Sequence, residues 1–332
     1  MVSSVISKQA ELVEEAAVGA AAASSLSGAR GRGRRAPRGV KIKETRADRA
    51  FVTVAYVLLT VFLLVVLLPL LNIVASSLSS PHAVSSGQVL FWPIDITFRG
   101  YTEALGNPAI VRGFANSVFY TVVGTVISVA GTVAIAYPLS RQNLFGRKVL
   151  TGAVVFTMLF SGGVIPMYLV VQSLGLLDTR WSMLLPNAIG VWQVIIAMVF
   201  FRSSIPDEVY EAAQLDGASE LRILWTIVLP LAKPLIAVIA LMYAIMQWNS
   251  YFDALLYLRN ADLQPLQLVL RGLLVLNDSG GGGNVAEQLR RRELADLLRY
   301  STVVIATVPM LVVYPFVAKY FNKGIMVGAV KG

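Results

Sequence analysis

The sequence predicts an all-α membrane protein, and two observations support this fold class. The first is composition: of 332 residues, 56% are hydrophobic and only 14% are charged, with a mean hydropathy of +0.68. Soluble domains carry charge on about a quarter of their residues. The second is a set of six apolar segments, each close to the roughly 20 residues that a helix needs to cross a bilayer. We therefore expect six transmembrane helices.

The chain begins with a polar and basic tail over residues 1–49. Alanine, serine and glycine dominate its first part, and a run of arginines follows from Arg30. No apolar region of signal-peptide length with a cleavage site follows it, so we interpret it as uncleaved. Its composition predicts a disordered cytoplasmic extension retained for topology, with attraction to the membrane surface as the alternative.

The six predicted spans follow in order along the chain, separated by polar connections. The third contains Gly162, Gly163 and Pro166, which are expected to weaken or kink that helix. In the first connection Phe91, Trp92 and Tyr101 suit a membrane interface. The spans are expected over residues 50–75, 114–139, 149–171, 183–201, 228–248 and 301–318.

The distribution of basic residues predicts the orientation of these spans. If both termini are cytoplasmic, most of the 28 lysines and arginines lie on the cytoplasmic side, as membrane proteins prefer. The arginines at 290–292 and Arg299 oppose this assignment. They lie in a connection of about 50 residues, near the length at which the preference weakens.

One charged stretch, residues 206–230, lies between the fourth and fifth spans. Its acids and loop backbone cannot lie in hydrocarbon, so it must sit in water beside the membrane. Two short helices around a bend are expected: Pro206 suits a first helical position, Gly217 a left-handed helix end and Ser219 the cap of a second helix.

This stretch resembles the EAA loop of ATP-binding-cassette (ABC) importer permeases, through Glu-Ala-Ala, a glycine four residues on, and a later Val-Leu-Pro. The resemblance implies a type I importer fold in which the loop is a cytoplasmic coupling helix docked on an ATPase subunit. Glu211 would contact the ATPase, the two alanines would permit close packing, and Gly217 would make the bend. An amphipathic interfacial helix is the alternative, but the first helix lacks the basic residues such helices carry. The implied coupling residues are Glu208, Glu211, Ala212, Ala213, Asp216, Gly217, Leu229 and Pro230.

The resemblance extends over residues 50–332 to the maltose-type sugar permeases, closest to the branch for oligosaccharides and aldouronate-like sugars. It is carried by FSGGVIPMYLVVQSLGLLDT, the pair Trp248-Asn249, QPLQLVLRGLL and KYFNKGIMVGAVKG. The tail and the glycine run 280–283 depart from it. The resemblance implies a bacterial cytoplasmic (inner) membrane location. It also implies a second permease subunit, two cytoplasmic ATPase subunits holding ATP and Mg, and an extracytoplasmic solute-binding protein.

No enzyme or cofactor site is expected in the chain itself. It has no GxxxxGK[ST] phosphate-binding loop, so ATP hydrolysis is assigned to the partner subunits. With no cysteine and a single histidine, His82, a metal site is not expected.

Polar side chains within the spans are candidates for a sugar path, because they are costly in a membrane. Gln247 and Asn249 are the strongest pair, as an outer gate. The alternative is that such residues satisfy neighbouring helices or lie at the interface. The candidates are Asn116, Tyr120, Asn187, Gln193, Tyr243, Gln247, Trp248 and Asn249.

The external connection 249–299 is predicted to contain a short surface helix. Leu266, Leu270, Leu273 and Leu274 recur at helical spacing with Arg271 opposite. The resemblance implies that the glycine-rich tip reaches the solute-binding protein, whereas a plain flexible connector is the alternative. The tip residues concerned are Asp278, Ser279, Gly280 and Gly281.

The predicted function is therefore the permease subunit of an ATP-driven, binding-protein-dependent importer of sugars, expected to be oligosaccharides. Two other classes stay open. An ion-driven secondary transporter would carry charges inside its spans and inverted repeats. A membrane scaffold would have no solute path.

Overall fold

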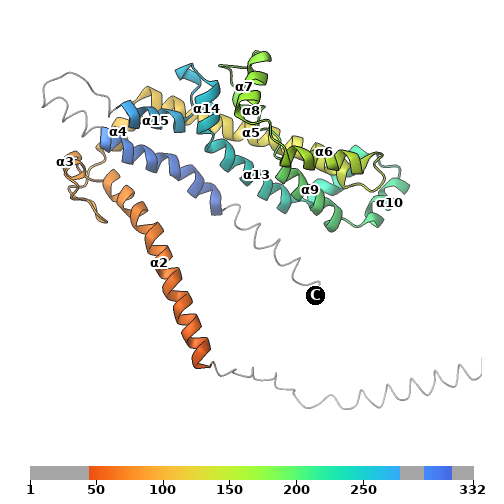
Figure 1. Ribbon diagram of the computed structural model, residues 1–332, viewed down its shortest axis with the longest axis horizontal. Coiled ribbons are helices and arrows are strands. Elements are labelled where there is room, and N and C mark those ends of the chain that lie inside the picture. The colour runs from red at the N-terminus through yellow and green to blue at the C-terminus, as the bar shows by residue number, and fades with distance from the viewer. Residues whose placement is uncertain (1–44, 277–294, 316–332) are drawn as a thin grey trace, which may run out of the picture. The chain divides into compact units, whose positions relative to one another are not determined.

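The computed structural model describes residues 45–276 and 295–315, and all regular structure in these residues is helical, without strands (Figure 1). The all-α prediction is confirmed over this part. The predicted tail over 1–49 is described only from residue 45. The tip predicted to contact a binding protein lies outside the described residues, namely Asp278, Ser279, Gly280 and Gly281.

The first long helix, α2 (Arg46–Ser77), crosses the boundary between the two units into which the chain divides, Met1–Leu63 and Leu64–Gly332. Its start is capped reciprocally. The Asp48 carboxylate accepts hydrogen bonds from the Thr45 N–H and hydroxyl, and the Thr45 Oγ1 accepts from the Asp48 N–H. At 32 residues, α2 is about 48 Å long, more than a bilayer core requires.

The connection after α2 is folded, not simply extended. It contains α3 (Pro81–Ser85) and α4 (Arg99–Gly106). The Asn72 side chain at the end of α2 donates to the backbone carbonyls of Val89 and Leu90, which holds the connection against the helix.

The second unit is built around α5 (Pro108–Ser140). This helix packs against α9 (Val191–Ser204), α13 (Lys233–Trp248) and α15 (Leu266–Leu276). Asn107 caps its start, and Pro108 occupies its first turn, where a missing N–H is tolerated. The helix therefore begins six residues before the predicted span. Small residues on α5 allow the neighbouring helices to approach closely, as in other membrane bundles.

The third predicted span is broken, as its glycines and proline indicate. The helices α6 (Arg147–Leu159) and α7 (Val164–Ser173) meet at 113°. Gly163 has a φ of 84°, a backbone conformation that side chains with a Cβ rarely adopt.

The fourth predicted span, 183–201, is not one continuous helix. The short α8 (Trp181–Leu184) and the 14-residue α9 (Val191–Ser204) are separated by a stretch containing Pro186. Proline at the second position of that break cannot supply the N–H that would continue α8.

The fifth predicted span is also bent, which the sequence analysis did not anticipate. The first arm is α11 (Glu220–Ile223), the π turn η1 (Leu224–Val228) and α12 (Leu229–Leu231). It meets α13 (Lys233–Trp248) at 82°. The straight part of the span therefore starts five residues after the predicted position 228.

The external segment forms α14 (Tyr251–Tyr257), the 3₁₀ turn η2 (Ala261–Leu263) and α15 (Leu266–Leu276). The leucine spacing correctly predicts the helix α15, and Arg271 is exposed on the side opposite the leucines, as predicted. Leu266 and Leu270 are buried in a cluster with Ala104, Ile110 and Ala306.

Close packing of α15 on α5 depends on Gly113. A Cβ at this position would lie 3.2 Å from the Cα of Leu266 and 3.0 Å from a methyl of Val269. We expect Gly113→Val to destabilise the protein by about 1–3 kcal/mol, the usual cost of overpacking. Thermal unfolding of the purified protein measures this. Gly152→Val is the matched control, because no atom lies within 4 Å of a Cβ there. Equal melting temperatures for the two variants would contradict this account.

The last described helix is Ala295–Pro315, which begins earlier than the predicted span 301–318. The described residues thus contain three helices long and apolar enough to cross a membrane, two bent pairs that could each be a span, and the shorter α9. These elements correspond one to one with the six predicted spans, and the count of six stays a prediction.

Candidate functional site

The charged stretch follows α9 and folds into α10 (Asp207–Leu215), a bend and α11, which begins the first arm of the bent fifth span. Pro206 precedes the helix as its N-cap residue, one position earlier than predicted. Asp207 and Glu208 then lie in the first turn, where negative charge is favoured by the helix dipole.

The helix α10 has two unlike faces. Tyr210 and Ala213 are buried against the rest of the protein. Glu208, Glu211 and Ala212 are exposed, and the Leu215 side chain is 90% exposed. Of the two alanines predicted to permit close packing, one therefore faces inward and only Ala212 is presented outward.

The bend after α10 has the predicted local structure. Gly217 has a φ of 74° and donates its N–H to the Gln214 carbonyl, and the Ala218 N–H reaches the Ala213 carbonyl. The Ser219 hydroxyl then accepts from the Arg222 N–H and caps α11. Asp216 is exposed beside the bend, while Leu229 and Pro230 lie farther on in α12.

Glu220, at the start of α11, ties the bend to the end of α5. Its carboxylate accepts from the Tyr137 hydroxyl at 2.6 Å and from the Gln214 carboxamide at 3.1 Å. The Arg141 guanidinium lies 3.9 Å from the same carboxylate. The contacts of Glu220 with Tyr137 and Arg141 join residues about 80 positions apart, and the sequence analysis missed them.

Arg141 also lies over the ring of Tyr210, with 3.4 Å between the guanidinium carbon and the ring centroid. Such a cation–π contact holds the buried face of α10 against the end of α5. Burial raises the pKa of Tyr210 above its ordinary value, and Arg141 opposes this shift. The phenol therefore stays neutral at physiological pH. We call Tyr137, Arg141, Tyr210 and Glu220 the loop anchor.

Among the predicted sugar-path residues, Asn116 and Tyr120 are occupied by structural bonds. The Asn116 carboxamide donates to the carbonyls of Asp262 and Gln264, and the Tyr120 hydroxyl donates to that of Leu263. They fix the external segment on α5, which is the alternative role that the sequence left open.

Three further candidates are buried where α5, α9 and α13 meet. The Tyr243 hydroxyl accepts from the Gly190 N–H and bonds the Thr132 hydroxyl. Gln193 reaches the sulfur of Met246 at 3.6 Å, and Gln247 packs against Gly124. These side chains fill the contacts between the three helices.

Asn187 lies outside this core and is exposed. Its carboxamide donates to the Asp253 carboxylate at 2.9 Å. Burial raises the pKa of Asp253, and this hydrogen bond opposes the shift. The pair connects the break before α9 to α14.

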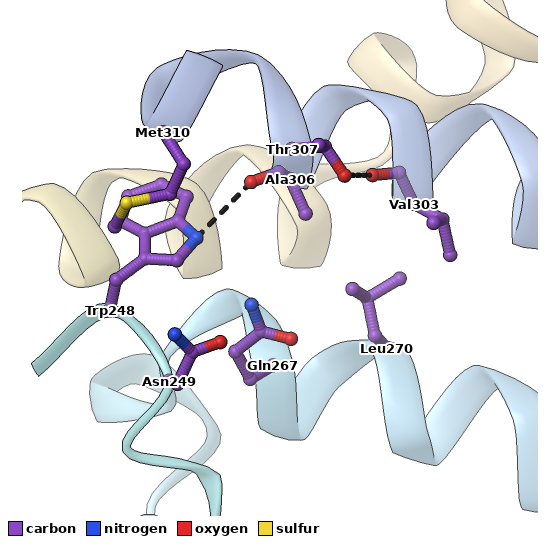
Figure 2. A pocket seen from close by; sticks show the side chains of 8 residues that line it. All are labelled: Trp248, Asn249, Gln267, Leu270, Val303, Ala306, Thr307 and Met310. Atoms are coloured by element: carbon purple, nitrogen blue, oxygen red, sulfur yellow. Dashed lines mark hydrogen bonds between the residues drawn. The ribbon is translucent and has the colours of Figure 1, made fainter. Parts of the chain in front are cut away.

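Trp248 and Asn249 are the predicted residues that do line a cavity, of about 260 Å³, between α15 and the last described helix (Figure 2). The Trp248 indole N–H donates to the Ala306 carbonyl, which fixes the ring as one wall. Gln247 is buried against Gly124 and does not line this cavity, so the two residues of the predicted gate do not share it. Gln267 and Thr307 also line the cavity, and sequence analysis missed both.

Comparison with known proteins shows which family the chain belongs to. No family model matches the chain. It is 40% identical to protein LplC of Bacillus subtilis, covering 87% of this chain and 97% of LplC. It is also 40% identical to the polygalacturonan/rhamnogalacturonan transport system permease protein YtcP of the same organism, covering 86% of this chain and 99% of YtcP. The chain belongs to the sugar ABC transporter permeases.

A solved structure supports the same assignment. One chain of a bacterial ABC transporter involved in the import of the acidic polysaccharide alginate is 38% identical, with a TM-score of 0.77. The match covers 84% of this chain and 99% of that chain. The all-helical architecture is thus that of an ABC importer permease. Permeases of this family are inner-membrane proteins and are not enzymes, because the ATPase activity lies in separate subunits.

Proposed function

We propose that this permease couples ATP hydrolysis by partner subunits to sugar import, with α10 as its coupling helix. The observation that carries the proposal is the combination of two faces on one short helix. The loop anchor holds the inner face to α5, while the outer face presents Glu208, Glu211 and Ala212 free of the remaining described chain. Such a helix can bind another protein through its outer face and transmit the movement of that protein to α5.

The proposed topology has six spans with both termini in the cytoplasm, so that α10 faces the ATPases. Lysine and arginine placement supports this orientation. The two bent pairs and the interrupted fourth segment would each count as one span. Broken helices of this kind are tolerated in membranes where the freed backbone groups are buried in protein.

The proposed mechanism is alternating access by rigid-body motion. Closure of two ATPase subunits would move α10, and the loop anchor would transmit that movement to the end of α5. Because α5 packs against α9, α13 and α15, these helices would move with it as one body. This is coupling between distant sites through a two-state element.

The proposed cargo is an oligosaccharide delivered by an extracytoplasmic binding protein, with a second permease completing the pathway. The names of YtcP and of the alginate transporter support polymeric, acidic sugars as the class to test. The two non-ABC alternatives are disfavoured by family membership. Whether the second permease is another copy of this chain is part of the same test.

Reconstitution with two ATPases, a partner permease and the binding protein tests the proposal. We expect sugar uptake into proteoliposomes that needs internal ATP and survives proton and sodium ionophores. Uptake abolished by ionophores and indifferent to ATP would instead identify an ion-driven transporter. ATP hydrolysis that the sugar-loaded binding protein never stimulates would identify a scaffold.

The loop anchor gives a prediction about coupling. Glu220→Ala and Tyr137→Phe should each reduce sugar transported per ATP hydrolysed, because α10 would no longer move firmly with α5. Coupling free energies of 1–3 kcal/mol correspond to about 5- to 150-fold, and the half-exposed Glu220 points to the lower end, about fivefold. The double variant should be no worse than the poorer single variant, because both remove the same contact. Independent, multiplying losses would show that the two residues do not act together.

A further inference from the structure

A groove beside the end of α13 combines aromatic, amide and cationic side chains, and the coupling function proposed above gives this combination no role. It has two adjoining parts, the cavity of about 260 Å³ described above and a second of about 470 Å³. Both parts share Asn249, Gln267, Leu270 and Val303, so they form one depression. We call it the outer groove; its polar and aromatic lining comprises Trp248, Asn249, Tyr251, Gln267, Arg271 and, at its edge, Thr307.

The amides in the outer groove have unused hydrogen-bonding capacity. Asn249 donates one N–H to the Ile245 carbonyl at 2.8 Å, which leaves its oxygen and a second N–H. Within residues 45–276 and 295–315, nothing hydrogen-bonds the Gln267 carboxamide. Figure 2 shows both carboxamides in the space between α15 and the helix that carries Thr307. A carboxamide offers both a donor and an acceptor, which matches the paired hydroxyls of a sugar ring.

Arg271 supplies a positive charge to the wider part of the groove. Its guanidinium carbon lies 5.4 Å from the centroid of the Tyr251 ring, within cation–π range. No carboxylate of the described residues pairs with Arg271. A guanidinium left without a protein carboxylate is suited to bind one from a ligand, with two parallel hydrogen bonds.

We propose that the outer groove is a subsite for an acidic oligosaccharide. Arg271 pairs with the carboxylate of a uronic acid ring, and Asn249 and Gln267 bind hydroxyls of that ring or its neighbour. The wider part has a volume within the roughly 300–1,000 Å³ of small-molecule sites. The inference rests on the proposed sugar import and deepens it, by naming the residues of this chain that recognise an acidic sugar ring.

The polarity of the groove argues against lipid as its occupant. Two carboxamides and a guanidinium facing hydrocarbon would each carry a desolvation cost, and such residues in membrane proteins usually face water or a substrate path. Leu270 and Val303 line the same groove, as expected of a sugar site, where apolar ring faces also need contact.

The absence of cysteine from the sequence allows a direct test with a single introduced thiol. Thr307→Cys places it in the groove, in a side chain of similar size. The assembled importer in proteoliposomes, resting and vanadate-trapped, is treated with a water-soluble methanethiosulfonate, and labelling of this chain is read by mass spectrometry. Trigalacturonate should slow labelling by about tenfold at ten times its dissociation constant. Its methyl ester, which has the same rings without the charge, and the neutral trisaccharide raffinose should protect far less.

Matched variants assign the protection to the charge. In the Thr307→Cys background, Arg271→Gln should abolish protection by trigalacturonate, while Arg271→Lys should retain part of it. Arg259→Gln changes another exposed arginine of the same external segment, outside the groove, and should leave protection intact. Ala261→Cys places a thiol on an exposed residue of the same external segment, outside the groove, and this thiol should label at a rate that no sugar changes.

Three labelling results would overturn the subsite even where sugar protects the thiol or fails to reach it. These are equal protection by the acid and its ester, protection that survives Arg271→Gln, and labelling in both states only by an apolar maleimide, which would place the groove in lipid. The proposed function fails separately, if the wild-type importer takes up none of the three sugars with ATP. ATP-dependent uptake without protection of the thiol would refute the subsite alone.

Discussion

Glu211→Lys should reduce ATP-dependent sugar uptake to background while leaving the permease in the membrane. Glu211 is exposed on the outward face of α10, and the change replaces a negative by a positive charge at the centre of the proposed docking surface. Reversing a charge at an interface adds repulsion from every group that formerly attracted it, which can cost several kcal/mol. Uptake and co-purification of the ATPase subunits measure the effect together.

The matched control is Glu103→Lys, a charge reversal on the exposed face of α4. Within the described residues, Glu103 pairs with the exposed Arg99, one turn earlier at 3.7 Å, and such pairs contribute about 0.5 kcal/mol or less. This variant should keep ATPase binding and uptake near wild type. Normal ATPase binding and normal uptake in Glu211→Lys would refute the assignment of α10 as the coupling helix.

Features of the fold that depend on residues close together in the sequence were predictable from the sequence. Apolar length located the helical segments, and Gly162, Gly163 and Pro166 predicted the break between α6 and α7. The break at the fifth span was missed for a physical reason. Pro230 and Pro234 are compatible both with a helix start and with a helix interruption, and only the packing of the two arms decides between them.

The environment of a helix is harder to predict than its existence. The leucines of α15 gave the right period, but a leucine stripe does not say whether it meets protein, lipid or another chain. The deciding partner is Gly113, which lies about 150 residues earlier and whose missing side chain admits α15 against α5. A glycine inside an apolar span gives no local sign of this role.

The candidate sites divide in the same way. The left-handed Gly217 and the Ser219 cap are local devices and were predicted correctly. The loop anchor joins Glu220 to Tyr137 across 83 positions, a relation that no spacing rule in a single sequence contains. Likewise, the outer groove brings Thr307 beside Asn249 only after α15 has packed inward, so sequence analysis found one wall and missed the other.

Gly217→Pro should abolish uptake as completely as Glu211→Lys, by changing the path of the backbone and not the charge. Gly217 has a φ of 74°, whereas proline fixes φ near −65°. Proline would also remove the N–H that donates to the Gln214 carbonyl at 3.0 Å. The bend would then no longer present Glu220 to Tyr137 and Arg141, so α10 would lose its attachment to α5. The apolar segments are unchanged, so membrane insertion should persist, as fractionation would show.

Two variants separate this effect from a general loss of structure. Gly217→Asn keeps the N–H and tolerates the left-handed conformation, so it should retain most uptake. Gly87→Pro makes the same change at a glycine with a φ of 71°. The Gly87 N–H also donates to a carbonyl at the end of a short helix, α3, but the proposed topology places this helix on the external side of the membrane. It should leave ATPase binding intact. If Gly217→Pro assembled with the ATPases and transported sugar at the rate of Gly217→Asn, the bend would have no part in coupling, and the loop anchor could not be the element that transmits the movement of α10.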